Sequence, residues 1–257
     1  MPTQIQEIKE RPILFSGEMV KAILAGNKTQ TRRKATVHDW PTDVTYAEEG
    51  WGKGKSPKPK WLFTDDGAFN GFSLNCPYGE AGDKLWVRET WATSVACDAR
   101  PPSDMEKPGR GYGWPVWYAA DGVVNTRRDD PVPQGGPGFT TMGKCRPSIF
   151  MPRWASRITL EITAVRVQRL QEISEHDAEA EGCSHDFLHS DTCSNDNCAL
   201  CGGVDDCEGV AVSAKENYRA LWERINGKGS WDANPWVWVV AFKKVFNAPD
   251  EPHAKNL

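Results

Sequence analysis

"RITLEITAVRVQRL", residues 157–170, is the stretch that most limits the fold of this chain. Apolar and polar positions alternate from Ile158 to Ile162, which is typical of a strand with one buried face. The alternation resumes at Val165 in shifted phase, which predicts a β-bulge. The stretch therefore predicts one long, interrupted strand around which the other elements are arranged.

Short helices and further strands flank this strand. Ser16 is a suitable N-cap for a helix over 17–25 that ends at Gly26, and Ser213 with Glu216 forms a capping box. The other expected elements are a strand over 84–91, an acidic helix from Ser174 to about Gly182, a helical stripe of Tyr218, Leu221, Trp222 and Ile225 that ends before Gly227, and a buried closing strand over 235–245.

This order of elements predicts the α+β class: a small, partly closed β-barrel with peripheral helices and long loop insertions. We expect a single domain and flexible termini. The domain would cover residues 11–246, with insertions at about 40–75, 98–148 and 183–210 and termini at 1–10 and 247–257. The insertion at 40–75 contains "WGKGKSPKPK" and predicts a mobile loop, and that at 98–148 predicts one strand between loops.

Composition bounds the class of protein. The chain has 257 residues and 39% hydrophobic residues, which is enough for a sizeable core. The opening "MPTQIQEIKE" lacks the apolar run of a secretory leader, and the sequence has no apolar stretch long enough to span a bilayer. We therefore expect a cytoplasmic protein with no membrane partner, whose eight cysteines are thiols or metal ligands rather than disulfides.

Charge is distributed unevenly. Residues 172–208 hold eleven acids and no lysine or arginine, and removing them from the net charge of −4 leaves +7 on the rest. An acidic appendage on a basic body fits a protein with a polyanion-binding face elsewhere, although a solvated acidic loop gives the same count.

Cysteines in the acidic segment have partial zinc-site spacing. Cys198 and Cys201 form a Cys-x-x-Cys pair followed by two glycines. We predict one structural zinc ion and no organic cofactor; the ligands would be Cys193, Cys198, Cys201 and Cys207, with Cys183, His185 and His189 as alternates. The alternative is a disordered acidic loop with free thiols, in which Cys183 packs as a small apolar residue.

Four blocks carry a family resemblance: "RPILFSGEMVKAILAGNKTQTRR" (11–33), "GEAGDKLWVRETWA" (79–92), "MPRWASRITLEITAVRVQRLQEISEHDAEAEG" (151–182) and "YRALWERINGKGSWDANPWVWVVAFKKV" (218–245). In this order they resemble ASCH-domain proteins of phages and prophages. The family hallmark is Gly-x-Lys-x-x-Glu-x-Arg, and this chain has Gly26, Lys28 and Arg33 but Thr31 at the glutamate position. The resemblance implies a PUA-like β-barrel with a cleft for RNA, modified nucleosides or nucleotides, and host cytoplasm if the protein is phage-encoded.

With threonine at the glutamate position of the hallmark, the chain resembles the bacterial N4-acetylcytidine amidohydrolases. These enzymes carry Lys-x-x-Thr at the hallmark and a glutamate on a later strand. This resemblance implies Lys28 as proton acceptor, Thr31 as nucleophile and Glu89 as proton donor. A threonine hydroxyl needs a neighbouring base, and a desolvated lysine can serve as one. The alternative is structural: Lys28 and Glu89 pair as a salt bridge, and Thr31 is present for β propensity.

Arginine and tryptophan residues near these blocks suit nucleic acid, because guanidinium groups pair with phosphates and indole rings stack on bases. The candidates are Arg32, Arg33, Arg88, Trp91, Arg153, Trp154 and Arg157. Alternatively, the tryptophans are core residues, which we favour for Trp86, Trp236 and Trp238.

Two hypotheses follow. The first is a cleft that binds RNA, a modified nucleoside or a nucleotide, either as a noncatalytic binder or with amidohydrolase activity on an N-acylated cytidine-like substrate. The second is a phage accessory module without catalysis, whose zinc-stapled acidic insertion engages a host protein.

Overall fold

The computed structural model describes residues 8–35, 43–47, 60–65, 68–105, 115–125, 141–183 and 213–245. Its class is α+β, with a five-stranded sheet in the order β1-β6-β10-β11-β2 and two three-stranded sheets. The chain forms two compact units. Unit 1 comprises residues 1–26, 81–162 and 242–257, unit 2 comprises 27–80 and 163–241, and the long strands β10 (Thr159–Arg169) and β11 (Trp236–Val245) run through both.

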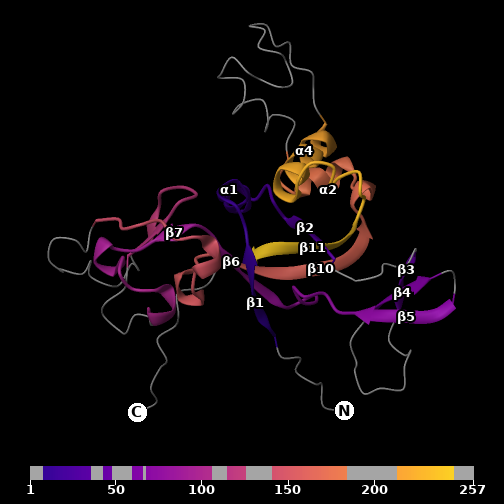
Figure 1. The fold of residues 1–257 in the computed structure, drawn as a ribbon, viewed down its shortest axis with the longest axis horizontal. Coiled ribbons are helices and arrows are strands. Elements are labelled where there is room, and N and C mark those ends of the chain that lie inside the picture. The colour runs from indigo at the N-terminus through magenta and orange to yellow at the C-terminus, as the bar shows by residue number, and fades with distance from the viewer. Residues whose placement is uncertain are drawn as a thin grey trace, which may run out of the picture. The chain divides into compact units, whose positions relative to one another are not determined.

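Unit 1 begins with β1 (Glu10–Leu14) and α1 (Gly17–Ala25). The Ser16 side chain accepts a hydrogen bond from the Met19 amide, and Gly26 ends the helix with a φ of 84°, as the sequence predicts. Strand β6 (Lys84–Arg88) pairs in parallel with β1 and antiparallel with the start of β10 (Figure 1). Ile13 of β1 and Leu85 and Val87 of β6 are buried on the core face of these strands, and Trp86 is buried on the other face.

The rest of unit 1 is a small sheet of β7 (Trp91–Ala92), β8 (Val116–Tyr118) and β9 (Val124–Asn125). Single turns of 3-10 helix accompany it at Val95–Cys97, Pro102–Asp104, Ser148–Phe150 and Arg153–Ala155. Its core contains Trp91, Cys97, Met105, Val116, Tyr118, Met151 and Ala155. The expected strand over 84–91 is interrupted, since β6 ends at Arg88 and β7 begins at Trp91.

Unit 2 contains β2 (Gln30–Lys34), which pairs antiparallel with β11, together with α2 (Glu175–Ala180) and α4 (Ala214–Asn226). The predicted capping box at Ser213 is present, and Ser174, where the acidic helix was expected to begin, is the N-cap of α2. A single turn of 3-10 helix, Leu170–Glu172, follows β10. The core comprises Leu170, Ile173, Ala178, Cys183, Ala214, Tyr218, Trp222, Trp231, Val237 and Val239.

Two loop predictions are wrong. The segment 40–75 contains a three-stranded antiparallel sheet of β3 (Asp43–Ala47), β4 (Lys60–Asp65) and β5 (Ala68–Leu74). The described residues of the segment 98–148 contain two strands, β8 and β9, rather than one. In both cases short β-prone runs, such as "KWLFTD" and "PVWY", are flanked by glycine-, proline- and lysine-rich sequence that dominates the composition.

Most of the expected core residues are buried. Trp86, Trp236 and Trp238 are buried, which confirms the core prediction for these three. Ile225, at the end of the expected α4 stripe, is instead 54% exposed. Near its last turn a helix extends past the core it covers, so periodicity continues where burial stops. Among the described residues, no helix combines the length and apolar character that crossing a membrane requires.

Candidate functional site

Strand β2 is positioned in unit 2 by its contacts with α2 and β11. The Thr29 amide donates to the carbonyl of Ala180, and Lys28 forms an isolated β-bridge with Glu181. These contacts attach the start of β2 to the end of α2, while residues 30–34 pair with β11. The stretch after Gly26 therefore presents its side chains to α2 from a fixed backbone.

Lys28 is fully enclosed at this junction. Its Nζ lies 2.6 Å from Glu181 Oε2 and 2.8 Å from the Glu181 carbonyl oxygen, and both side chains are buried. Because an ammonium group without a counterion is costly to bury, the Glu181 carboxylate is what allows Lys28 to lie inside the unit.

Arg32 extends the network along β2. Its Nη2 lies 2.9 Å from Asp177 Oδ2 and its Nη1 lies 3.4 Å from Glu181 Oε1, while the Tyr218 ring lies 5.8 Å from the guanidinium carbon. Gln30 Nε2 donates to the Asp177 carbonyl at 3.4 Å. Gln30 and Arg32 therefore share the α2-facing side of β2, and Thr31, although buried, lies on the opposite side.

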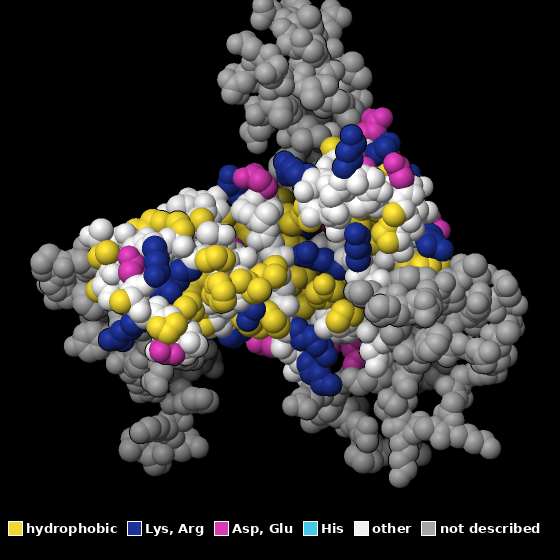
Figure 2. All heavy atoms as spheres, in the orientation of Figure 1, with side chains coloured by type: hydrophobic (Ala, Val, Ile, Leu, Met, Phe, Trp, Pro, Cys, Tyr) yellow, Lys and Arg dark blue, Asp and Glu magenta, His cyan; other side chains and the backbone are white. Residues whose placement is uncertain are grey.

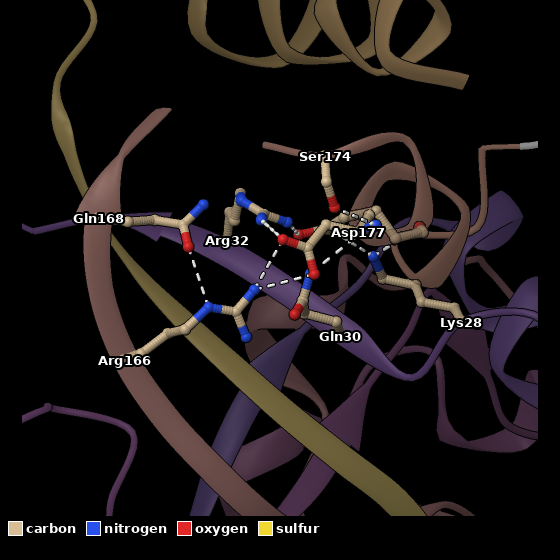
Figure 3. A network of polar contacts seen from close by, with 8 residues as sticks. Lys28, Gln30, Arg32, Arg166, Gln168, Ser174 and Asp177 are labelled. Carbon is tan, nitrogen blue, oxygen red and sulfur yellow. Dashed lines mark hydrogen bonds and ion pairs between the residues drawn. The ribbon is translucent and has the colours of Figure 1, made fainter. Parts of the chain in front are cut away.

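Asp177 also binds Arg166 of β10. Arg166 Nη2 donates to both carboxylate oxygens at 2.9 and 2.8 Å, and Arg166 Nε donates to Gln168 Oε1 at 2.9 Å (Figure 3). Burial acts to raise the pKa of Asp177, but the hydrogen bonds from Arg166 and the charge of Arg32 outweigh it and lower that pKa. The carboxylate is thus held ionised between two guanidinium groups.

The network contains more positive than negative groups. Lys28, Arg32 and Arg166 face the carboxylates of Asp177 and Glu181, so three cations meet two anions. The next residues of β2, Arg33 and Lys34, are also cationic, and Lys34 is exposed. This surplus of positive charge makes the β2 region a candidate for binding an anionic group.

Glu89 lies in unit 1 and has its own arginine partner. Arg157 Nε and Nη2 each lie 2.9 Å from a Glu89 oxygen, and Arg157 Nη1 lies 2.8 Å from Asp121 Oδ2. The guanidinium carbon lies 4.0 Å from the centroid of the Tyr118 ring. Burial raises the pKa of Glu89, and the hydrogen bonds from Arg157 oppose that shift only in part.

The three expected catalytic residues therefore have different surroundings. The structure brings Lys28 to Glu181 and Glu89 to Arg157, while Thr31 lies on β2. Lys28 and Thr31 belong to unit 2 and Glu89 to unit 1, so their convergence in one site stays a prediction.

The expected nucleic-acid contacts differ in exposure. Trp91 is completely buried, which matches the core alternative for that ring. Trp154 is only partly buried; it packs edge-on against Trp91 and donates its indole N–H to the Met105 carbonyl at 3.0 Å. Arg88 and Arg153 instead lie over the ring of Trp86.

The expected zinc ligands Cys193, Cys198, Cys201 and Cys207, and the alternates His185 and His189, lie outside the described residues. Cys183 is described: it is buried in the core of unit 2, and burial raises the pKa of its thiol to about 12. Cys183 therefore packs as a small apolar residue, which agrees with the alternative in which it is not a metal ligand. Within the described ranges no group of three or more metal-binding side chains is found.

Sequence reasoning missed Asp177, Glu181 and Arg166. Asp177 and Glu181 were assigned to an acidic appendage beginning at residue 172, whereas the described residues up to Cys183 are an integral part of unit 2. The available signal was their spacing, since residues four apart lie on one face of a helix. The sequence around Asp177 and Glu181 contains no signal for the distant cations with which these carboxylates pair.

Comparisons with protein-family models, with curated proteins and with solved structures give no match for this chain.

Proposed function

We propose that this protein is an ASCH-type binder of RNA or of a modified nucleoside or nucleotide, with the anionic part of the ligand at the β2 region of unit 2. The single observation that carries the proposal is the gathering of cations on and beside β2, where among the described residues Lys28, Arg32 and Arg166 pair with the carboxylates of Asp177 and Glu181. Because the side chains of Lys28 and Arg32 are fully buried, a phosphate group would pair with the next two residues of β2, the partly exposed Arg33 and the exposed Lys34.

The PUA-like barrel is part of the same proposal. The described strands give the order β1-β6-β10-β11-β2, with a parallel β1–β6 pair at one end. A barrel would require closure between the ends of this series, so closure belongs to the proposal rather than to the described fold.

RNA binding is tested by titrating the full chain with a fluorescent single-stranded RNA at several salt concentrations. We expect affinity to fall with salt, because each phosphate contact releases counterions with a slope of about 0.7 for single strands. Arg33→Ala should weaken binding and reduce the slope, whereas Arg219→Ala on α4, with a side chain 51% exposed, is the matched control. An RNA affinity that changes neither with salt concentration nor on substitution of Arg33 would overturn the proposal.

Amidohydrolase activity is a second candidate, favoured by the state of Glu89. Because burial raises its pKa, this carboxyl keeps a proton to higher pH than an exposed glutamate does, as a proton donor requires. In the proposed reaction Thr31 attacks the acyl carbon and its hydroxyl proton passes to water, while the acyl C–N bond breaks and Glu89 protonates the departing cytidine amino group. Water then hydrolyses the acyl-threonine ester to a carboxylic acid and free threonine.

The chemical test is to incubate the protein with N4-acetylcytidine and measure cytidine and acetate. Thr31→Val removes the hydroxyl at nearly constant volume and Glu89→Gln removes the proton donor, so each should abolish turnover. The absence of turnover in the wild-type chain, or activity that survives Thr31→Val, would leave binding as the function.

A further inference from the structure

One face of the β1–β6 pair in unit 1 places the exposed Leu14 next to the partly exposed Arg88, which lies over the buried Trp86. Pairing places Pro12 beside Trp86 and Leu14 beside Arg88, so these four side chains share a face. Leu14 is 41% exposed, although its neighbour Ile13 on the opposite face is buried. Figure 2 shows hydrophobic side chains next to Lys and Arg side chains on the surface over β1 and β6.

A 3-10 turn adds further apolar surface next to Arg88. Arg88 Nη1 donates to the Ile149 carbonyl at 3.1 Å, which fixes the turn Ser148–Phe150 beside the strand. In this turn Ile149 is 56% exposed and Phe150 is 57% exposed. Large apolar side chains that gather at the surface mark interaction sites, whereas single exposed ones do not.

The arginines are held in place by Trp86. The guanidinium carbons of Arg88 and Arg153 lie 4.6 and 6.0 Å from the centroid of its ring and cover it. Arg153 Nε also pairs with Glu10 at 3.0 Å, but Arg88 has no carboxylate partner among the described residues. Arg88 is therefore a pre-oriented cation with apolar side chains on either side of it.

We propose that this surface, which we call the β1–β6 platform (Leu14, Trp86, Arg88, Ile149, Phe150 and Arg153), binds an acidic amphipathic peptide segment of a partner protein. Aliphatic or aromatic side chains of the peptide pack on Leu14, Ile149 and Phe150. A carboxylate of the peptide pairs with Arg88. Interfaces of this kind are enriched in aromatic residues and arginine, and a few such residues supply most of the affinity.

Charge favours a peptide over a nucleic acid here. Glu10 and Glu161 lie on the same face as Lys84 of β6, and Glu10 is exposed. A phosphodiester backbone crossing this face would meet these carboxylates, whereas a peptide needs only one or two acidic groups near Arg88. The platform thus extends beyond the proposed RNA function, which rests on β2.

The test is selection from a displayed library of random twelve-residue peptides against the immobilised full chain, followed by affinity measurements on synthetic copies of the enriched peptides. We expect enriched peptides to combine acidic residues with aromatic or aliphatic ones. Phe150→Ala and Arg88→Gln should each weaken binding by about tenfold or more. The controls are Ile225→Ala, at a side chain as exposed as that of Phe150, and Lys21→Gln, at an exposed cation outside the platform, and both should leave affinity unchanged.

Melting curves of each variant establish that it is folded. The proposal is overturned if no peptide is enriched, if the enriched peptides lack acidic residues, or if binding is insensitive to both Phe150 and Arg88. It is equally overturned if Phe150→Ala instead dissociates a dimer in sedimentation, which would assign the platform to a second copy of the chain. Loss of RNA affinity in the same two variants without loss of peptide affinity would assign it to nucleic acid.

Discussion

The ammonium of Lys28 lies 2.6 Å from the carboxylate of Glu181, although 153 positions separate the two residues in the chain. This pair joins the start of β2 to the end of α2, and Glu181 also contacts Arg32. It is therefore the contact on which the buried charge of unit 2 most depends.

Removal of Glu181 should strongly destabilise the protein. Glu181→Gln leaves the Lys28 charge buried without an anion, and breaking a buried pair in this way typically costs about 3–5 kcal/mol of the free energy of unfolding. Urea denaturation measures the loss. Glu179→Gln, an exposed position of the same helix, is the control, and an equal effect at both sites would contradict the role of the pair.

Asp177 should make stability depend on acid pH. Its pKa is lowered in the folded protein from an ordinary value of 3.8, so its stabilising contribution is present above that value and is lost as the pH falls through the folded pKa. We expect Asp177→Asn to be less stable than wild type at neutral pH and the difference to shrink below about pH 4. Denaturant titrations at several pH values measure it, and a difference independent of pH would refute the prediction.

The Cys183 thiol should be unreactive in the folded protein. Since its pKa is raised to about 12 and the residue is buried, almost no thiolate is present or accessible at pH 8. Iodoacetamide followed by mass spectrometry should modify the exposed Cys145 rapidly and Cys183 only after unfolding. Similar rates at the two cysteines in the folded chain would show that the core is open there.

Zinc content tests the cysteine-rich segment directly. Freshly purified protein should contain about one zinc ion per chain, because four thiolates with Cys-x-x-Cys spacing suit a closed tetrahedral site. Elemental analysis measures it. The double variant Cys198→Ser with Cys201→Ser should lose the metal, while Cys145→Ser should retain it, and wild-type protein without zinc would end the prediction.

Gly26 should matter for its backbone conformation alone. Its φ is 84°, and a Cβ at this position would meet no atom within 4 Å. Gly26→Ala should therefore cost about 1 kcal/mol from left-handed strain, and Gly26→Asn less, because asparagine tolerates this region. Thermal unfolding ranks the three proteins, and an alanine variant as stable as wild type would contradict the cap assignment.

Local signals in the sequence predicted local structure. The caps at Ser16, Gly26 and Ser213 were predictable because each depends on residues within one helical turn. The long strand β10 was predictable in the same way, from alternation within a single segment.

The features that could not be predicted depend on residues distant in the chain, or on short strands that lie next to sequence of loop-like composition. The partners of Lys28 and Glu89 could not be predicted, because Glu181 and Arg157 lie far from them in sequence and arginine or glutamate at those positions is equally common on solvated surfaces. The sheet of β3, β4 and β5 was missed because its strands flank a run rich in glycine, proline and lysine that is typical of loops.

The pairing of β2 with β11 and α2 also has a consequence during synthesis. On the ribosome, Lys28 and Arg32 emerge long before Glu181, and the strand partner of β2 begins only at Trp236. A nascent chain that ends before that residue lacks the hydrogen-bonding edge on which β2 is ordered. Strand β2 must therefore stay unpaired until almost the whole polypeptide has been made, and a truncation that removes β11 should disturb Lys28 as surely as a mutation of that residue does.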